Sequence, residues 1–352
     1  MKSGQTSNTM NEILRQPECW RRSLRTVAGF ELSDIFYARK GESREWLYIG
    51  CGTSYYLAQA AAATYTALTG MRARAVPASE VYLCPELALR KGERFVPVLI
   101  SRSGRTSEVL RAAEYLKQLG VSSLAITCDG NELKQVADCT IQLPVHELST
   151  VMTSSFTSML LALQYLSATL AGNFSFVQSL ESLPEAMDGL LKSQAGKIQN
   201  FVQQHSFEDY VYLGQGAFVG IAAEAALKVM ESSCSYAQSF HTMEFRHGPK
   251  SIVSPKTMIG FFLSSNSYED ELSVLQEMHD LGGIIFAVTN QADTRLTSHA
   301  HCLIEMGLAG PSLSHLAPAV VWGQLLGVLS GIKRGLNPDS PKNLTRSVVL
   351  GE

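Results

Sequence analysis

The sequence has little that would mark a membrane, secreted or nucleic-acid-binding protein. Its 352 residues contain no uninterrupted apolar run of the length that a membrane-spanning helix needs. The N-terminus has no apolar core of secretory length, so no export signal is expected. The net charge is only -3, which leaves no positive field to attract a nucleic-acid backbone. We therefore expect a soluble cytoplasmic protein that binds neither membranes nor nucleic acids.

Cysteine is present, but not in a pattern that builds a disulfide framework or a metal site. The seven cysteines are scattered, without a CxxC pair or a cluster of His and Cys. An odd number of isolated cysteines is typical of reduced thiols. The glycine turns also lack the GxGxxG fingerprint of dinucleotide sites. The sequence thus predicts that no metal and no redox cofactor is required.

The chain repeats itself, and this repeat organises its length. WLYIGCGTS, VPVLISRSG and SLAITCDG begin at positions 46, 96 and 123, and similar segments begin at 210, 258 and 285. Each segment is an apolar run followed by a turn, which is typical of a strand that leads into a helix or loop. Three matched elements in the same order at nearly constant spacing indicate an internal duplication. About two domains also suit a chain of this length.

The strands of both copies are continuously apolar, which predicts parallel sheets covered by helices on both faces. Helical patterns follow the strands at 54–69, 107–119, 151–171, 219–233, 268–281 and 313–334. We expect an α/β protein with a first domain over 1–183, a linker helix over 184–204 and a second domain over 205–352. Pro184 would lie in the first turn of the linker helix. The apolar segment 315–335 could be core or interface.

Two hydroxyl-rich loops of the first copy are the first candidate site. SRSGRTSEV, 101–109, ends an apolar strand and begins a helix, and CGTS, 51–54, follows an earlier strand in the same way. Ligands of α/β sheets collect at the carboxyl ends of strands, where hydroxyls, backbone N–H groups and helix N-termini suit a phosphate dianion. Ordinary helix N-caps would use the same residue types. The residues assigned to phosphate binding are Cys51, Gly52, Thr53, Ser54, Ser101, Arg102, Ser103, Gly104 and Thr106.

A helix of the second copy carries the second candidate site. In EAALKVME, 224–231, the charged residues Glu224, Lys228 and Glu231 share one helical face. A solvated salt-bridge stripe is the ordinary explanation. The rest of the helix is apolar, however, so these carboxylates are expected in a cleft where partial desolvation makes a usable base.

The third candidate is the loop FRHGPK, 245–250. His247 stands beside a rigid Gly-Pro pair and is the side chain best suited to proton transfer near neutral pH. Glu244, Arg246 and Lys250 surround it in the sequence. This crowding suggests an anionic ligand nearby, although a solvated loop would look the same.

At these residues the chain resembles the sugar isomerase (SIS) domain family, whose tandem members are sugar-phosphate enzymes. The resemblance rests on GCGTS, SRSGRTSE, two glutamates on one helix and FRHGPKS, and it extends from about residue 10 to the C-terminus. NEILRQPECWRRSL, EAALKVME and MTSSFT resemble the galactosamine-6-phosphate deaminase and tagatose-6-phosphate isomerase branch. The tail NPDSPKNLTRSV is similar to that of glucosamine-6-phosphate synthase.

The resemblance implies roles for individual residues. Glu231 would move a proton between C1 and C2 of the sugar, and His247, supplied by a neighbouring subunit, would open the ring. Glu224 and Lys228 would support them. Further substrate contacts would come from Thr153, Ser154 and Arg346.

One departure from the synthase pattern separates the two branches. The synthase uses a Lys in its tail to form a Schiff base, and this sequence has Arg346, whose guanidinium stays protonated. The chain also begins almost directly at the SIS region, without a glutaminase domain. Glutamine-dependent synthesis is therefore not expected.

We accordingly expect a homodimeric deaminase and isomerase of glucosamine or galactosamine 6-phosphate. Two alternatives stay open at this point. The first is a simple aldose-ketose isomerase of a sugar 6-phosphate, and the second is a non-catalytic SIS protein that senses a sugar phosphate.

Overall fold

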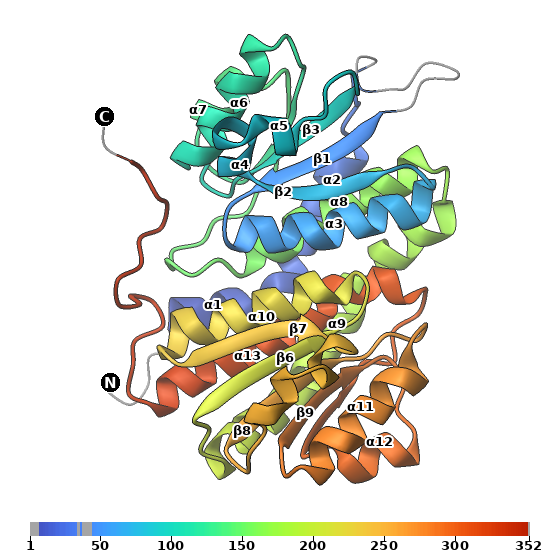
Figure 1. Cartoon of the computed structure of the whole chain (residues 1–352), viewed down its shortest axis with the longest axis vertical. Helices are drawn as coiled ribbons and strands as arrows, with labels where there is room; N and C mark the ends of the chain where they lie inside the picture. Colours follow the sequence, from blue (N-terminus) through green and yellow to red (C-terminus); the bar gives the residue numbers. More distant parts are fainter. Residues whose placement is uncertain (1–6, 34–35, 37–43, 351–352) are drawn as a thin grey trace. The chain divides into compact units, whose positions relative to one another are not determined.

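The apolar strands form two parallel sheets, as the sequence predicts. The structure, a computed structural model, describes residues 7–33, 36 and 44–350. Its contacts divide the chain into two units, one around each sheet (Figure 1). We call Glu18–His146, Ser154–Gln178 and Thr345–Glu352 the N-terminal unit, and Met1–Pro17, Glu147–Thr153 and Ser179–Leu344 the C-terminal unit. The sequence ranges proposed for the domains, which are continuous, stay a prediction.

The sheet of the N-terminal unit has the strand order β2-β1-β3-β4-β5, with every neighbouring pair parallel. Its strands are β1 Glu45–Gly50, β2 Ala73–Pro77, β3 Phe95–Ile100, β4 Leu124–Thr127 and β5 Cys139–Gln142. The chain leaves β1 for β2 on one side and returns to β3 on the other. The strand order thus reverses between β1 and β3, and ligands of open α/β sheets bind outside the carboxyl ends of the strands at such a point.

Helices cover both faces of this sheet. The helices are α2 Gln16–Ala28, α3 Thr53–Thr69, α4 Ala78–Leu83, α5 Pro85–Ala88, α6 Ser107–Gln118, α7 Glu132–Val136 and α8 Ser154–Leu170. On one face α4, α6 and α7 share an apolar core with the strands, and α3 packs with α8 on the other (Figure 1). Because both faces are covered, β1 is buried along its whole length.

The C-terminal unit repeats this topology. Its sheet has the order β7-β6-β8-β9-β10, which matches that of the N-terminal unit strand for strand. The strands are β6 Asp209–Gly214, β7 Tyr236–His241, β8 Thr257–Phe262, β9 Ile284–Thr289 and β10 Cys302–Glu305. The predicted fold class, an α/β protein with two tandem domains that each have a parallel sheet flanked by helices on both faces, is therefore confirmed.

The helices of the C-terminal unit also lie on both faces of its sheet. They are α1 Asn8–Leu14, α9 Phe174–Gln204, α10 Phe218–Ser233, α11 Tyr268–Asp280, α12 Thr294–His299 and α13 Leu316–Lys333. Short 3₁₀ turns lie at Glu244–Arg246, Pro249–Ile252 and Ser312–His315. Helices α11 and α12 share a core with the strands on one face, while α10 packs against α13 on the other (Figure 1).

One helix differs from the sequence prediction. The linker helix expected over 184–204 begins ten residues earlier, and Pro184 lies inside α9 rather than in a first turn. The residues before Pro184 continue the apolar pattern, with Phe176, Leu180 and Leu183 all buried. Tertiary packing of this face outweighs the usual preference of proline for a helix start.

Helix α13 is the one helix in the described part of the chain that is long and apolar enough to cross a membrane. Of its most apolar window, 89% is buried inside the protein. This burial is typical of a core helix and decides between the two roles left open for 315–335.

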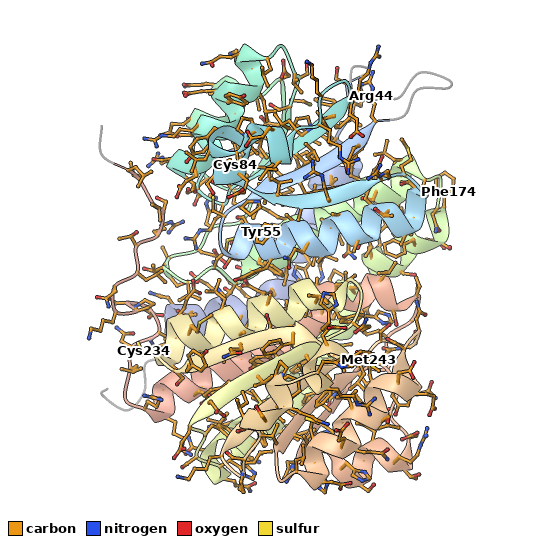
Figure 2. The ribbon with its side chains drawn as sticks, viewed as in Figure 1. Arg44, Tyr55, Cys84, Phe174, Cys234 and Met243 are labelled. Carbon is orange, nitrogen blue, oxygen red and sulfur yellow. The ribbon has the colours of Figure 1, made fainter. Side chains whose placement is uncertain are left out.

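No two of the seven cysteines, all in the described part of the chain, form a disulfide. Cys234 is exposed and ends α10 with a left-handed backbone, φ 49° (Figure 2).

Candidate functional site

The loop after β1 is shaped by a close approach between strand and helix. A Cβ atom at Gly50 would lie 2.7 Å from the backbone oxygen of Ser54, so only glycine fits there. Gly52 has φ 53° and precedes α3, whose first residue is Thr53. Thr53 and Ser54 are buried in the first turn of this helix. Gly214, at the end of β6, makes the same close approach to Phe218 in the C-terminal unit.

The loop after β3 is tied together by its own hydroxyl groups. Ser101 Oγ accepts from the backbone N–H of Gly104 at 3.1 Å and lies 3.2 Å from Thr106 Oγ1. Ser103 Oγ accepts from the N–H of Arg105 at 3.2 Å. Because the Ser103 oxygen accepts in this bond, its own hydrogen stays available to an anionic ligand.

These two loops flank the point between β1 and β3 where the strand order reverses, and together we call them the cradle. The side chains of Thr53, Ser54, Ser101 and Ser103 are all buried in it. Helices α3 and α6 begin there, so their positive ends favour a negative charge. Burial, with Glu108 nearby, raises the pKa of Cys51 to about 11, so its thiol stays protonated. Cys51 can therefore contribute its backbone but not a thiolate.

Gly130 offers a direct test of the cradle's shape. Its φ is 73°, and a Cβ atom there would lie 2.2 Å from the backbone oxygen of Ser103. Gly130→Ala should displace the loop and weaken the binding of a sugar phosphate by at least about tenfold, the cost of a shift near 1.4 kcal/mol. Gly172→Ala is the matched control, since Gly172 has φ 65° but nothing within 4 Å. Isothermal titration should find binding impaired in the first variant alone, and equal affinities would contradict this account of the loop.

The C-terminal tail of the chain contacts the cradle. Arg346 Nη2 lies 2.6 Å from Asp129 Oδ2, and the backbone oxygen of Arg346 accepts from Arg102 Nη2 at 2.6 Å. The N–H of Ser107, at the start of α6, donates to Val348 at 3.1 Å. The tail thus covers the start of α6, with the Arg102 side chain directed at the tail backbone. Roles for Arg102 and Arg346 in substrate binding stay predictions.

The three charged residues predicted to share a face of α10 are in contact. Lys228 Nζ lies 3.3 Å from Glu224 Oε1 and forms a hydrogen bond with Glu231 Oε2. The side chains of Glu224 and Lys228 are completely buried, and 14% of the Glu231 side chain is exposed. Because these side chains are buried, they are not a row of solvent-exposed salt bridges on the helix surface, which was the ordinary explanation of their spacing. Glu231 is the member of the group that a ligand can reach.

A row of glycines on α13 brings that helix close to this part of α10. Gly323, Gly327 and Gly331 recur every fourth residue and so share one face. A Cβ atom at Gly327 would lie 2.9 Å from the backbone of Lys228, and one at Gly331 would lie 2.1 Å from Ser232. The two backbones can therefore approach closely enough to exclude water from the buried part of the three charged side chains of α10, which we call the ion-pair group.

The charge state of this group follows from its burial. Burial alone would lower the pKa of Lys228, but the Glu224 and Glu231 carboxylates outweigh it and hold the pKa above its usual value. Lys228 is thus a fixed positive charge rather than a nucleophile. Its positive charge lies between the carboxylates of Glu224 and Glu231.

His247 lies between two short turns of the C-terminal unit, and its imidazole is exposed. Gly248, which follows, has φ 130°, a conformation that only glycine adopts readily. Arg246 and Lys250 both contact Glu277, at 2.7 and 2.6 Å. These contacts account for the basic residues of the loop without an anionic ligand. They leave His247 on a firmly held, solvent-facing turn.

Thr153 and Ser154, predicted to contact the substrate, are completely buried. The N–H and hydroxyl of Thr153 donate to Glu147 Oε1 at 2.9 and 3.2 Å. Glu12 accepts from Ser149 beside them, and burial, together with Glu147, raises its pKa. A substrate role for Thr153 and Ser154 stays a prediction.

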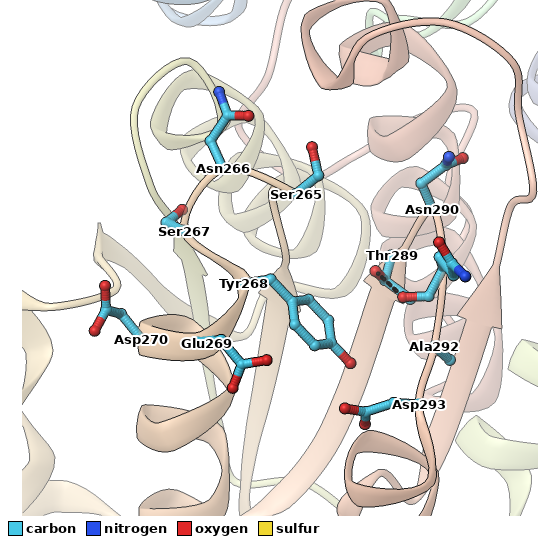
Figure 3. Close-up of a pocket in the computed structure, with 11 residues that line it drawn as sticks. Ser265, Asn266, Ser267, Tyr268, Glu269, Asp270, Thr289, Asn290, Ala292 and Asp293 are labelled. Atoms are coloured by element: carbon cyan, nitrogen blue, oxygen red, sulfur yellow. Dashed lines mark hydrogen bonds between the residues drawn. The ribbon is translucent and has the colours of Figure 1, made fainter.

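The C-terminal unit has a cavity of about 460 Å³ at the carboxyl ends of β8 and β9 (Figure 3). This place corresponds by topology to the second loop of the cradle. The ring of Tyr268 projects between the two loops that line the cavity, with Glu269 and Asp293 on either side of it (Figure 3), and Asp270 is a further lining residue. Arg295 pairs with both Glu269 and Asp293. Carboxylates here repel a phosphate dianion, which supports assigning phosphate binding to the N-terminal unit.

The loop after β8 of the C-terminal unit surrounds a buried carboxylate, that of Glu271. Glu271 accepts from the N–H of Ser264 and the hydroxyl of Ser267, both at 2.9 Å, and from Thr242 Oγ1 at 3.0 Å. Burial raises the pKa of Glu271 from 4.5 to about 7. The loop after β8 is thus closed by the carboxylate of Glu271, which comes from the first turn of α11.

This raised pKa predicts a pH-dependent stability. The fold favours protonated Glu271, so its contribution is complete below about pH 4.5 and is lost as the pH rises through about 7. Glu271→Gln lacks this titration. The difference in free energy of unfolding between this variant and the natural protein should therefore shift by about 3 kcal/mol in favour of the variant as the pH rises from about 4.5 to about 8. Urea unfolding across this range measures the gain. The exposed Glu269→Gln should show none, and parallel pH profiles for Glu271→Gln and the natural protein would contradict the assignment.

Two structurally important residues received no role from the sequence. Asp129 holds the tail through Arg346, and Glu271 closes the second loop. Asp129 follows the apolar strand of the repeated segment SLAITCDG. This position at the carboxyl end of a strand was the one signal in the sequence that could have marked it. Its partner is 217 residues away, so sequence spacing could not connect them.

Comparisons with known proteins show which family the chain is similar to. The SIS domain family matches residues 42–168. The chain is 30% identical to a D-galactosamine-6-phosphate deaminase of Shewanella, over 95% of this chain and 87% of that protein. It is 26% identical to a glutamine–fructose-6-phosphate aminotransferase of Bacteroides thetaiotaomicron, over 99% of this chain but only 59% of the relative's length.

The crystal structure of a glucosamine-6-phosphate deaminase from Thermotoga maritima is also similar. The TM-score is 0.80 at 30% sequence identity, and the match covers 98% of this chain and 100% of that one. The duplicated fold therefore occurs at full length in a protein with sugar-phosphate chemistry.

Proposed function

Because the chain belongs to the SIS-domain family of sugar-phosphate isomerases and deaminases, we propose that it converts a hexosamine 6-phosphate to a ketose 6-phosphate and releases ammonia. The observation that carries this proposal is the ion-pair group on α10. It leaves one carboxylate, Glu231, partly exposed beside a buried Lys228. Such a carboxylate suits removal and return of a proton on carbon.

The cradle supplies the remote binding that this chemistry needs. A phosphate held by Ser101, Ser103, Thr106 and the loop after β1 is far from the reacting carbons of a hexose. Its binding energy can therefore orient C1 and C2 without stabilising the ground state at the reacting centre. The proposal requires that the cradle and Glu231 act on one substrate molecule, whichever chain supplies each.

The reaction balances in four steps. His247 transfers the proton that opens the sugar ring to the free aldehyde. Glu231 then takes the proton from C2 while O1 takes up a proton from solvent, which gives a neutral enolamine, and the Glu231 proton returns to C1 while the nitrogen releases one. The product of this transfer is an imine at C2 of a ketose. Water adds to the imine carbon, and ammonia leaves, which makes the net reaction a hydrolytic deamination.

We further propose a cytoplasmic homodimer in which His247 serves the site of the neighbouring subunit. Mixed dimers of Glu231→Gln and His247→Ala test this arrangement. In a twofold dimer, half of the pairs are mixed and each mixed pair has one intact site, so about a quarter of the natural activity should return. Mixtures as inactive as either parent would place both residues in one chain.

A substrate panel tests the proposed function. Purified protein is supplied with glucosamine, galactosamine, glucose and tagatose 6-phosphates, and both ammonia and ketose are measured. We expect ammonia and ketose phosphate in equal amounts from one hexosamine. Ketose without ammonia would instead indicate a simple isomerase, and binding without turnover would indicate a sensor.

A further inference from the structure

Four histidines of the C-terminal unit lie together away from the residues discussed above. The ring of His279 lies 4.9 Å from that of His299 and 5.6 Å from that of His301. His205 in turn lies 5.9 Å from His301. Asp280 adds a carboxylate, with its Oδ1 atom 3.4 Å from Nδ1 of His279. The sequence gives no sign of this cluster, because its members come from separate elements.

The cluster joins the C-terminal ends of two neighbouring helices. His279 lies in the last turn of α11, and His299 is the last residue of α12. Each helix runs back along its parallel sheet after a strand, so these ends lie at the amino edge of the sheet. The cavity of Figure 3 lies at the opposite, carboxyl edge. The histidine cluster is therefore separate from the sites of sugar chemistry.

Hydrogen bonds orient the imidazole of His299. Its Nδ1 lies 2.7 Å from the backbone oxygen of Arg295. A carbonyl only accepts, so neutral His299 carries its proton on Nδ1 and presents a bare Nε2. Metal-bound histidines are commonly fixed in this way by a backbone carbonyl. In His301, by contrast, Nδ1 accepts the N–H of Ile285 at 3.0 Å, so its proton is on Nε2 and it is not a ligand.

The three remaining groups converge. One ligand atom from each of His279, Asp280 and His299 lies within 4.8 Å of the other two. Small side-chain rotations would bring them to the spacing of about 3.4 Å that tetrahedral bonds near 2.1 Å require. We propose that His279, His299 and Asp280 bind one first-row transition-metal ion such as Zn²⁺.

The exposure of these groups indicates what kind of site this is. The side chains of His279 and Asp280 are 35% and 75% exposed, so water completes the coordination. Two imidazoles and a carboxylate favour Zn²⁺ or Ni²⁺ over the hard cation Mg²⁺. The ion links α11 to α12 and stabilises the C-terminal unit without a part in the proposed deamination.

Titration of the full-length, chelator-treated protein with zinc chloride tests the site. We expect one Zn²⁺ per chain by calorimetry, no heat with magnesium chloride, and a melting temperature that rises with zinc concentration. His299→Gln should weaken zinc binding by at least about tenfold. His241→Gln removes an exposed histidine outside the cluster and should bind zinc like the natural protein.

Each outcome decides the proposal. Equal zinc affinity of the His299 and His241 variants would overturn the proposal. So would a magnesium affinity of the natural protein as high as its zinc affinity. Asp280→Asn keeps the shape of an exposed side chain and so folds normally. Its weaker zinc affinity would support the site even if the His299 variant were poorly folded. Turnover of hexosamine phosphate should be the same with and without zinc.

Discussion

Glu231→Gln lowers kcat for the deamination by about 10² to 10⁴-fold, the range that a general base contributes. The amide keeps the size of the carboxylate but cannot accept the C2 proton. The cradle is unchanged, so the substrate's dissociation constant stays within about twofold. Steady-state kinetics and isothermal titration on the same preparation separate the two effects.

Glu185→Gln is the matched control, because Glu185 is an exposed glutamate on α9. It should leave both kcat and affinity unchanged. A Glu231 variant that turns over normally would remove Glu231 from the reaction. A variant that loses binding as well as turnover would show a structural role instead.

Lys228→Met destabilises the protein by about 3–5 kcal/mol, as expected when one partner of a completely buried ion pair is removed. The raised pKa of Lys228 means that its contribution is complete at neutral pH and is lost only at strongly alkaline pH. In the variant, Glu224 is left buried beside a methionine. It must take up a proton, so the destabilisation should be larger at pH 8 than at pH 5. Denaturant unfolding at the two pH values measures this.

Two further variants show whether the effect comes from the unpaired charge. Adding Glu224→Gln to Lys228→Met removes the buried carboxylate and should restore part of the stability. Lys192→Met replaces an exposed lysine of α9 and should change stability by less than about 0.5 kcal/mol. A Lys228 variant as stable as the Lys192 variant would mean that the group is not buried in solution.

The parts of the fold that could be predicted are those that depend on residues close together in the sequence. Apolar strands and the glycine turns at Gly50 and Gly214 are repeated, so duplication and sheet type followed directly. The face shared by Glu224, Lys228 and Glu231 followed from helical spacing alone. Pro184 was misplaced, because packing of α9 outweighed a local preference.

What could not be predicted depends on contacts between distant segments. The pairing of Asp129 with Arg346 and the loop closed by Glu271 both need the folded chain. The glycines of α13 were visible in the sequence, but their partner helix was not. The convergence of His279 and His299 arises only when α11 and α12 pack side by side.

The reaction run in deuterium oxide tests the central claim most directly, which is that Glu231 carries the proton between C2 and C1. A carboxylate that has taken the C2 proton exchanges with solvent during some turnovers. NMR of the ketose phosphate after many turnovers should therefore show deuterium at C1, and none should appear with Glu231→Gln. Ketose formed without any deuterium at C1, or equal labelling by the variant, would contradict the account.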